Sequence, residues 1–225
     1  LSFALNYYFS GQEFNNFNFK ITNLVIHIVN GFLVLWLTCG LWLAWIRNRP
    51  ELELLAPSAA SWQWLPCIVA FLWTIHPIQL TSVLYVVQRM TSMSATGVLA
   101  GLAIFVLGRH WCDRGRVGGL WIMAAAVVFG TSLGFVSKEN ALLLLLFAGL
   151  IELAFFRRDR LAHIIRRRLY LVYAVLFATF VLTAIVVLIR SDFILALYEI
   201  RDFTLVERVL TQSRVLFMYL GLIFG

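Results

Sequence analysis

The sequence predicts an all-α protein, a polytopic bundle of transmembrane helices. Of its 225 residues 62% are hydrophobic and only 13% are charged, and the mean hydropathy is +0.89. Several apolar runs approach the roughly 20 residues that a helix needs to cross a bilayer. Because lipid offers no partner to backbone N–H and C=O groups, each crossing is expected to be helical. We expect about six full crossings, a truncated seventh and one interfacial helix.

The first half of the chain contains three apolar runs and one amphipathic segment. Residues 21–46 form the first crossing. The run 62–75 is short and ends at His76-Pro77, where proline cannot continue an undisturbed helix. Between residues 80 and 90 apolar side chains recur every three or four positions opposite polar ones, which predicts an interfacial helix. Residues 92–108 then cross back.

The second half continues the alternation of apolar runs and polar loops. Residues 118–136, 141–156 and 169–189 are expected to cross. A polar segment, 190–214, leads to an apolar run from Val215 that the end of the chain truncates. We treat residues 1–225 as one transmembrane domain, and we expect a further helix and the first external loop to precede Leu1.

The arrangement of positive charge predicts the orientation in the membrane. The loops 47–61, 109–117 and 157–168 share one side and carry eleven of the eighteen Lys and Arg residues. Short loops rich in Lys and Arg remain in the cytoplasm. The net charge of +7 is therefore explained by topology, and no nucleic-acid partner is expected.

Polar residues suited to phosphate chemistry lie on the predicted external side. His76 has the imidazole for acid–base work or phosphate binding, and Gln88-Arg89 offers an amide beside a guanidinium. Lys138-Glu139 supplies a cation and a carboxylate. Each has an ordinary alternative: a histidine at a helix end, an arginine snorkelling to headgroups, and a mutually neutralising surface pair.

Other polar residues have simpler interpretations. Asn23, His27 and Asn30 share one face of the first span, where hydrogen bonding between helices explains them at least as well as function. His110 and His163 are expected to be ordinary loop residues. The three cysteines fit small membrane-embedded hydrophobes, since no CxxC or Cys/His spacing is present; they are Cys39, Cys67 and Cys112. HExxH, P-loop, dinucleotide and GxSxG motifs are also absent from the sequence.

Four segments resemble one family when taken in order. They read LSFALNYYFSGQEFNNFNFKITNLVIHIVNGFLVLWL, HPIQLTSVLYVVQRMTSMSA, SKENALLLLL and ERVLTQSRVLFMYLGLIFG. They are similar to the membrane portion of bacterial tetratricopeptide-repeat proteins related to transmembrane O-mannosyltransferases, within the GT-C glycosyltransferases. The resemblance implies a GT-C-like bundle in a bacterial inner membrane, and it leaves open whether tetratricopeptide repeats follow Gly225. It also implies transfer of a sugar from a polyprenyl-phosphate donor on the outer face.

The resemblance also implies roles for particular residues. By analogy, donor phosphate would be contacted by His76, Gln88, Arg89 and Lys138, and the lipid phosphate by Arg208 and Arg214. Glu139 would orient a neighbour or the acceptor. The relatives carry a glutamate shortly after His-Pro, whereas residues 79–82 here hold no acid. The catalytic base is expected upstream of Leu1, with Glu13 a weak substitute, and a requirement for a divalent cation stays open.

Three functions follow as hypotheses. The first is a glycosyltransferase that uses a lipid-linked sugar as substrate. The second is a non-catalytic membrane anchor or assembly subunit that keeps the fold and binds other membrane proteins, which the missing acid after His-Pro favours. The third is a carrier of lipid-linked intermediates, which would use the same phosphate-binding residues. An acidic residue in the loop upstream of Leu1 would discriminate the enzyme from the other two. Membrane lipid is a partner in all three.

Overall fold

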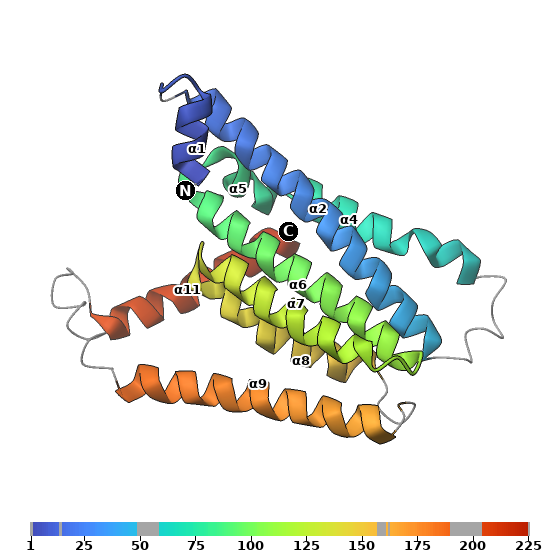
Figure 1. Cartoon of the computed structure of the whole chain (residues 1–225). Coiled ribbons are helices and arrows are strands. Elements are labelled where there is room, and N and C mark those ends of the chain that lie inside the picture. The colour runs from blue at the N-terminus through green and yellow to red at the C-terminus, as the bar shows by residue number, and fades with distance from the viewer. Residues whose placement is uncertain are drawn as a thin grey trace. The chain divides into compact units, whose positions relative to one another are not determined.

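The computed structural model describes residues 2–13, 15–48, 59–156, 161, 163–189 and 204–224, and none of these residues lies in a β-strand. Its helices are α1 (Ser2–Phe9), α2 (Asn16–Arg47), α4 (Leu65–Ile75), α5 (Leu80–Leu84), α6 (Arg89–Asp113), α7 (Gly118–Phe135), α8 (Leu143–Phe155), α9 (His163–Ile189) and α11 (Leu205–Phe224) (Figure 1). Four short 3-10 turns join them: η1 (Ala59–Trp64), η2 (Pro77–Gln79), η3 (Val86–Gln88) and η4 (Glu139–Leu142).

The predicted helical membrane protein is confirmed in its general form. Three helices within the described residues are long and apolar enough to cross a bilayer: Asn16–Arg47, Val86–Asp113 and Gly118–Phe135. The pair Trp62–Ile75 and Pro77–Leu84, bent by 49°, would make a fourth. The six expected crossings are thus not reached among these residues. One reason is that α8 has 13 residues, fewer than the roughly 20 that span the hydrocarbon core.

The chain forms two compact units, residues 1–173 and 174–225. The expectation of one transmembrane domain over residues 1–225 stays a prediction. In the first unit α6 and α7 lie side by side (Figure 1), and glycines lie at their contact. A Cβ atom added at Gly97 would lie 2.6 Å from the Gly134 nitrogen. Small residues of this kind let the backbones of two membrane helices approach closely.

Polar residues cap two of the helices that begin earlier than the apolar runs predicted. Asn15 precedes α2, and its side-chain oxygen accepts a hydrogen bond from the Phe17 nitrogen at 2.9 Å. At α11 the Glu207 carboxylate accepts from the Thr204 nitrogen at 2.7 Å, while the Glu207 nitrogen donates to Thr204 Oγ1 at 3.3 Å. This reciprocal capping box starts α11 at Leu205. The segment predicted as polar and irregular up to residue 214 is therefore helical from there.

The break after α4 is confirmed, but the helix predicted near 80–90 is wrong as a single helix. Residue His76 is extended (φ −60°, ψ 133°), and Pro77 opens η2. Residue Tyr85 is extended as well (φ −90°, ψ 114°) and separates α5 from η3. Between the two breaks only five residues form α-helix. The chain therefore changes direction twice before α6 begins at Arg89.

Candidate functional site

The polar face of α2 hydrogen-bonds the broken segment that follows α4. Asn23 Nδ2 donates to the carbonyl oxygens of Val83 and Tyr85, each at 3.2 Å. His27 Nε2 lies 2.9 Å from the Thr74 carbonyl oxygen. Carbonyl groups next to a helix break lack partners within their own helix, and lipid supplies none. Asn23 and His27 therefore supply hydrogen-bond partners to carbonyl groups beside the two breaks.

Asn30 extends this face toward α6. Its Nδ2 donates to the Ser92 carbonyl oxygen at 3.1 Å, and its Oδ1 accepts from Thr96 Oγ1 at 2.7 Å. Asn30 is 3% exposed. The expected hydrogen bonding between helices is confirmed for all three polar residues of the first span.

Arg89 is completely buried where α6 begins. Its Nε donates to Asn23 Oδ1 at 2.8 Å, and its Nη2 donates to Asn6 Oδ1 at 2.8 Å and to the Phe19 carbonyl oxygen at 2.9 Å. The guanidinium also lies 4.7 Å from the ring centre of Phe3. Snorkelling to headgroups is therefore wrong for this side chain, which is 0% exposed. Its role as a donor-phosphate ligand stays a prediction.

The charge on Arg89 is held by amides, carbonyl groups and aromatic rings. Among the residues that the structure describes, the ion pairs are Arg47–Asp113, Arg109–Asp113 and Arg109–Glu152, and none includes Arg89. Burying an ion that no opposite charge balances is expensive. The dense set of hydrogen bonds offsets part of that cost.

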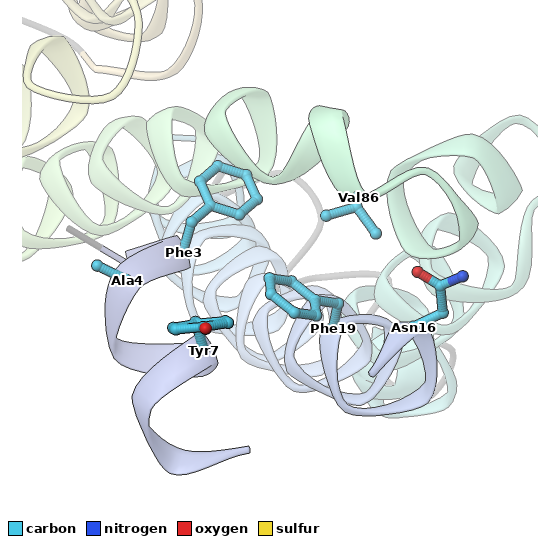
Figure 2. A pocket seen from close by; sticks show the side chains of 6 residues that line it. All are labelled: Phe3, Ala4, Tyr7, Asn16, Phe19 and Val86. Carbon is cyan, nitrogen blue, oxygen red and sulfur yellow. The ribbon is translucent and has the colours of Figure 1, made fainter. Parts of the chain in front are cut away.

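A pocket of about 540 Å³ lies beside this arginine. Figure 2 shows the side chains that line it, which come from α1, α2 and η3: Phe3, Ala4, Tyr7, Asn16, Phe19 and Val86. The rings of Phe3 and Phe19 are the same two that contact the Arg89 guanidinium. Phe3 and Phe19 therefore separate the pocket from the buried Arg89 guanidinium. The residues that line the pocket suit an apolar ligand group.

Lys138 lies against the first turn of α6. Its Nζ donates to Thr91 Oγ1 at 3.0 Å, and its carbonyl oxygen accepts from Ser94 Oγ at 3.3 Å. Glu139 is exposed, and the ion pairs between described residues do not include one between Glu139 and Lys138. The mutually neutralising pair considered for these two residues is therefore not formed here.

His76 ends α4 with its ring fixed by a local hydrogen bond. The Ile78 nitrogen donates to His76 Nδ1 at 3.2 Å. In the neutral imidazole Nδ1 is then the acceptor, so the proton resides on Nε2. The side chain is half-buried. His76 can therefore present one N–H donor to a ligand, while Gln88, in the turn before α6, is exposed.

The remaining predicted residues lie on α11, in the turn between α1 and α2, or outside the described residues. Arg208 and Arg214 are exposed on α11 in the second unit, whose position relative to the first is not determined. Glu13 is exposed in the turn between α1 and α2. The predicted external residues Arg190, Arg201 and Asp202 lie outside the described residues.

The sequence interpretation missed a buried charge network at the opposite end of the first unit. Arg109 Nε donates to the two carboxylate oxygens of Glu152 at 2.9 and 3.2 Å. Arg109 also pairs with Asp113, which Arg47 contacts at 3.3 Å. The signal was Glu152 itself, the one acid in the apolar run 141–156, because an ionisable residue at membrane depth requires a partner.

Two residues expected in a loop lie in α6 instead. Arg109 is 0% exposed and His110 is 8% exposed. His110 Nε2 lies 2.9 Å from the Gly40 carbonyl oxygen, which ties α6 to α2. The loop predicted at 109–117 begins only after Asp113. His163 is exposed at the start of α9.

The described residues hold no group of three or more His, Cys, Asp or Glu side chains placed to bind a metal ion. The three cysteines are free thiols. Comparison of the chain with protein-family models, curated proteins and solved structures finds no match.

Proposed function

We propose that this chain is the membrane domain of a glycosyltransferase that takes its sugar from a polyprenyl phosphate. The reaction would occur on the side of the bilayer opposite the arginine-rich loops. The observation that carries this proposal is the Lys138 ammonium held 3.0 Å from Thr91 Oγ1, with the exposed carboxylate of Glu139 next in sequence. Transfer from phosphate to a hydroxyl group needs a cation for the leaving phosphate and a carboxylate near the acceptor.

Lys138 has capacity for a ligand. An ammonium group has three N–H donors, and one of them is used in the part of the chain that the structure describes. In this proposal Lys138, His76 Nε2 and Gln88 contact the donor phosphate, and Glu139 orients the acceptor.

Arg89 takes part only when α1 moves. At present Asn6 and the Ser2 carbonyl group, both in α1, occupy its Nη2 and Nη1 donors. In this proposal displacement of α1 opens both donors to phosphate, and the neighbouring apolar pocket takes the first part of the lipid chain.

The proposal includes the finer topology. Six full crossings and a seventh beginning in α11 would place residues 137–140 on the external face of a bacterial inner membrane. Residues 114–117, which follow α6, and the arginine-rich stretch 157–168, which includes the first residues of α9, would then lie on the cytoplasmic side, as the positive-inside rule requires.

Transfer of radiolabelled sugar from a polyprenyl-phosphate donor to endogenous acceptors tests this proposal. Membranes containing the full-length protein should lose about 100-fold in rate with Lys138→Ala, because one preorganised charge contact is worth that much. His76→Ala should also reduce transfer. Lys20→Ala removes an exposed lysine at the start of α2 and should leave the rate unchanged.

A non-catalytic anchor or assembly subunit is the second candidate, and the state of Arg89 favours it. Its guanidinium is buried and bound to α1 and α2, as expected of a residue that serves packing. Absence of protein-dependent transfer with every donor, together with stable co-purification of another membrane complex, would support this candidate. Movement of labelled lipid across the bilayer without product would indicate a carrier.

A further inference from the structure

Tryptophans are concentrated at the end of the first unit that holds the Arg109 network. Six of the eight tryptophans lie there, at the ends of α2 and α6, in η1 and at the start of α7: Trp42, Trp45, Trp62, Trp64, Trp111 and Trp121. Trp64 is 70% exposed and Trp121 is 77% exposed. Tryptophan gathers where the hydrocarbon core meets the headgroups. These six tryptophans therefore mark the boundary of the membrane.

The helix ends that carry these tryptophans are held together by contacts that side chains make. Arg47, in the last turn of α2, contacts Asp113 at the end of α6. Arg109 joins α6 to Glu152 near the end of α8. Thr38 Oγ1 on α2 lies 3.4 Å from the Pro66 carbonyl oxygen, which brings the start of α4 to the same region.

Among the described residues of this end, the same contacts pair both acids with arginine and leave the exposed charge positive. Asp113 and Glu152, 12% and 1% exposed, are both paired with arginine. Among the described residues here, the exposed charged side chains are arginines: Arg114, Arg116, Arg167 and Arg168. By sequence, the loops 47–61, 109–117 and 157–168 carry eleven Lys and Arg against four Asp and Glu.

The arginines also have apolar neighbours that reach outward. Arg116 lies over the Trp111 ring at 5.4 Å. In the first turns of α9, Ile165 and Leu169 are buried, whereas Ile164 is 63% exposed beside Arg167 and Arg168. Alternation of exposed apolar and basic side chains suits the boundary between acyl chains and headgroups.

We infer that this end of the bundle binds anionic phospholipid headgroups. The ligand is a lipid phosphate in the leaflet that the arginine-rich loops face, bound by Arg116, Arg167 and Arg168 while the tryptophans contact its glycerol and upper acyl chain. Each arginine near an anionic surface strengthens association by about five-fold. This inference needs only a membrane protein and does not depend on the proposed transferase activity.

Quenching of tryptophan fluorescence tests the inference, because the reporters lie at the proposed surface. The chain is reconstituted in bilayers of phosphatidylcholine and phosphatidylglycerol at a fixed ratio, with bromine on one lipid at a time. Preferential binding makes brominated phosphatidylglycerol the stronger quencher at equal mole fraction. The triple variant Arg116→Gln, Arg167→Gln, Arg168→Gln should lose at least five-fold in relative association constant.

Two controls separate charge from structure and from location. The variant with lysine at the same three positions should retain the preference for phosphatidylglycerol. Lys20→Gln removes an exposed cation near the start of α2, whereas the proposed surface lies at the end of that helix, and this variant should match wild type. Equal quenching in fully brominated phosphatidylcholine shows that a variant keeps its fold. The inference is overturned by absence of preference in wild type, by an unchanged triple glutamine variant, by loss in the lysine variant, or by an equal loss in Lys20→Gln.

Discussion

Arg89 joins α1, α2 and α6 through hydrogen bonds to side chains and main-chain oxygens. Arg89→Met should lower the free energy of unfolding by about 3 kcal/mol, because it leaves the buried Oδ1 of Asn23 without its donor and removes one donor each from Asn6 Oδ1 and the Phe19 carbonyl oxygen. Denaturation in mixed detergent micelles measures the change. Gln88→Met, at the exposed neighbouring position, should alter stability by less than about 0.5 kcal/mol. Equal losses in the two variants would contradict this assignment.

Arg109 and Glu152 should behave as a coupled pair. Either Arg109→Gln or Glu152→Gln alone breaks the buried Arg109–Glu152 ion pair and should cost about 3 kcal/mol. The double variant should cost clearly less than the sum of the two single changes, because the same pair is lost in both. The measurement is a double-mutant cycle on the free energy of unfolding. Additive losses would show that the two side chains do not interact.

Part of this residue-level arrangement could be predicted from the sequence. Polar residues spaced three and four apart in an apolar helix must find partners in lipid, which is why the hydrogen bonding of Asn23, His27 and Asn30 was foreseeable. The position of Arg89 was not. Its partner Asn6 lies 83 residues away in sequence, and periodicity within one helix carries no information on such a contact.

At the scale of single helices, the contact between α6 and α7 should tolerate no added side chain. Gly97→Ala should cost about 1–3 kcal/mol, since its Cβ would meet the Gly134 nitrogen at 2.6 Å and the Gly130 oxygen at 2.8 Å, which are backbone atoms. Gly149→Ala in α8 is the matched control, because nothing lies within 4 Å of the added carbon. Thermal unfolding in detergent compares the two. Equal midpoints would show that the helices can separate slightly without loss.

The first turn of α11 should depend on pH. Hydrogen bonds from Thr204 lower the pKa of Glu207 from its usual 4.5. A carboxylate with a depressed pKa stabilises the folded state above its unfolded value, and that contribution is lost as the pH falls through the folded value. NMR titration of the full chain should find Glu207 titrating below 4.5, with the Leu205 amide signal shifting in parallel. Thr204→Val should return the pKa of Glu207 toward 4.5; a normal pKa in wild type would refute the capping box.

The limits of helix prediction have a physical origin here. The break at His76-Pro77 was foreseeable because proline has no N–H to donate. The break at Tyr85 was not, since apolar residues continue at helical spacing on both sides of it. What stabilises that extended residue is a hydrogen bond to its carbonyl group from Asn23 on another helix. Likewise, Thr204 and Glu207 start α11 inside a segment whose polarity indicated a loop.

At the scale of the whole molecule, orientation can be tested with single cysteines. In a background lacking Cys39, Cys67 and Cys112, a cysteine at Asn140 should react with an impermeant maleimide from outside, and one at Gly115 only after the membrane is opened. Both native residues are exposed, so access decides the result. Labelling of both cysteines from the same side would contradict the assignment of these two loops to opposite sides of the membrane, which rests on their charge.

The bonds between α2 and the broken segment also constrain how the protein is made. The bent α4–α5 segment leaves the ribosome with carbonyl groups beside its breaks, at Thr74 and Val83, whose hydrogen-bond partners are side chains of α2. The helix that supplies their donors has already been synthesised, because α2 comes first in the chain. If the bent segment entered the membrane before α2, its unpaired carbonyl groups would face hydrocarbon. Because it enters after α2, the side chains of α2 are already there to donate hydrogen bonds. The order of the helices along the chain is thus also an order in which each can safely enter lipid.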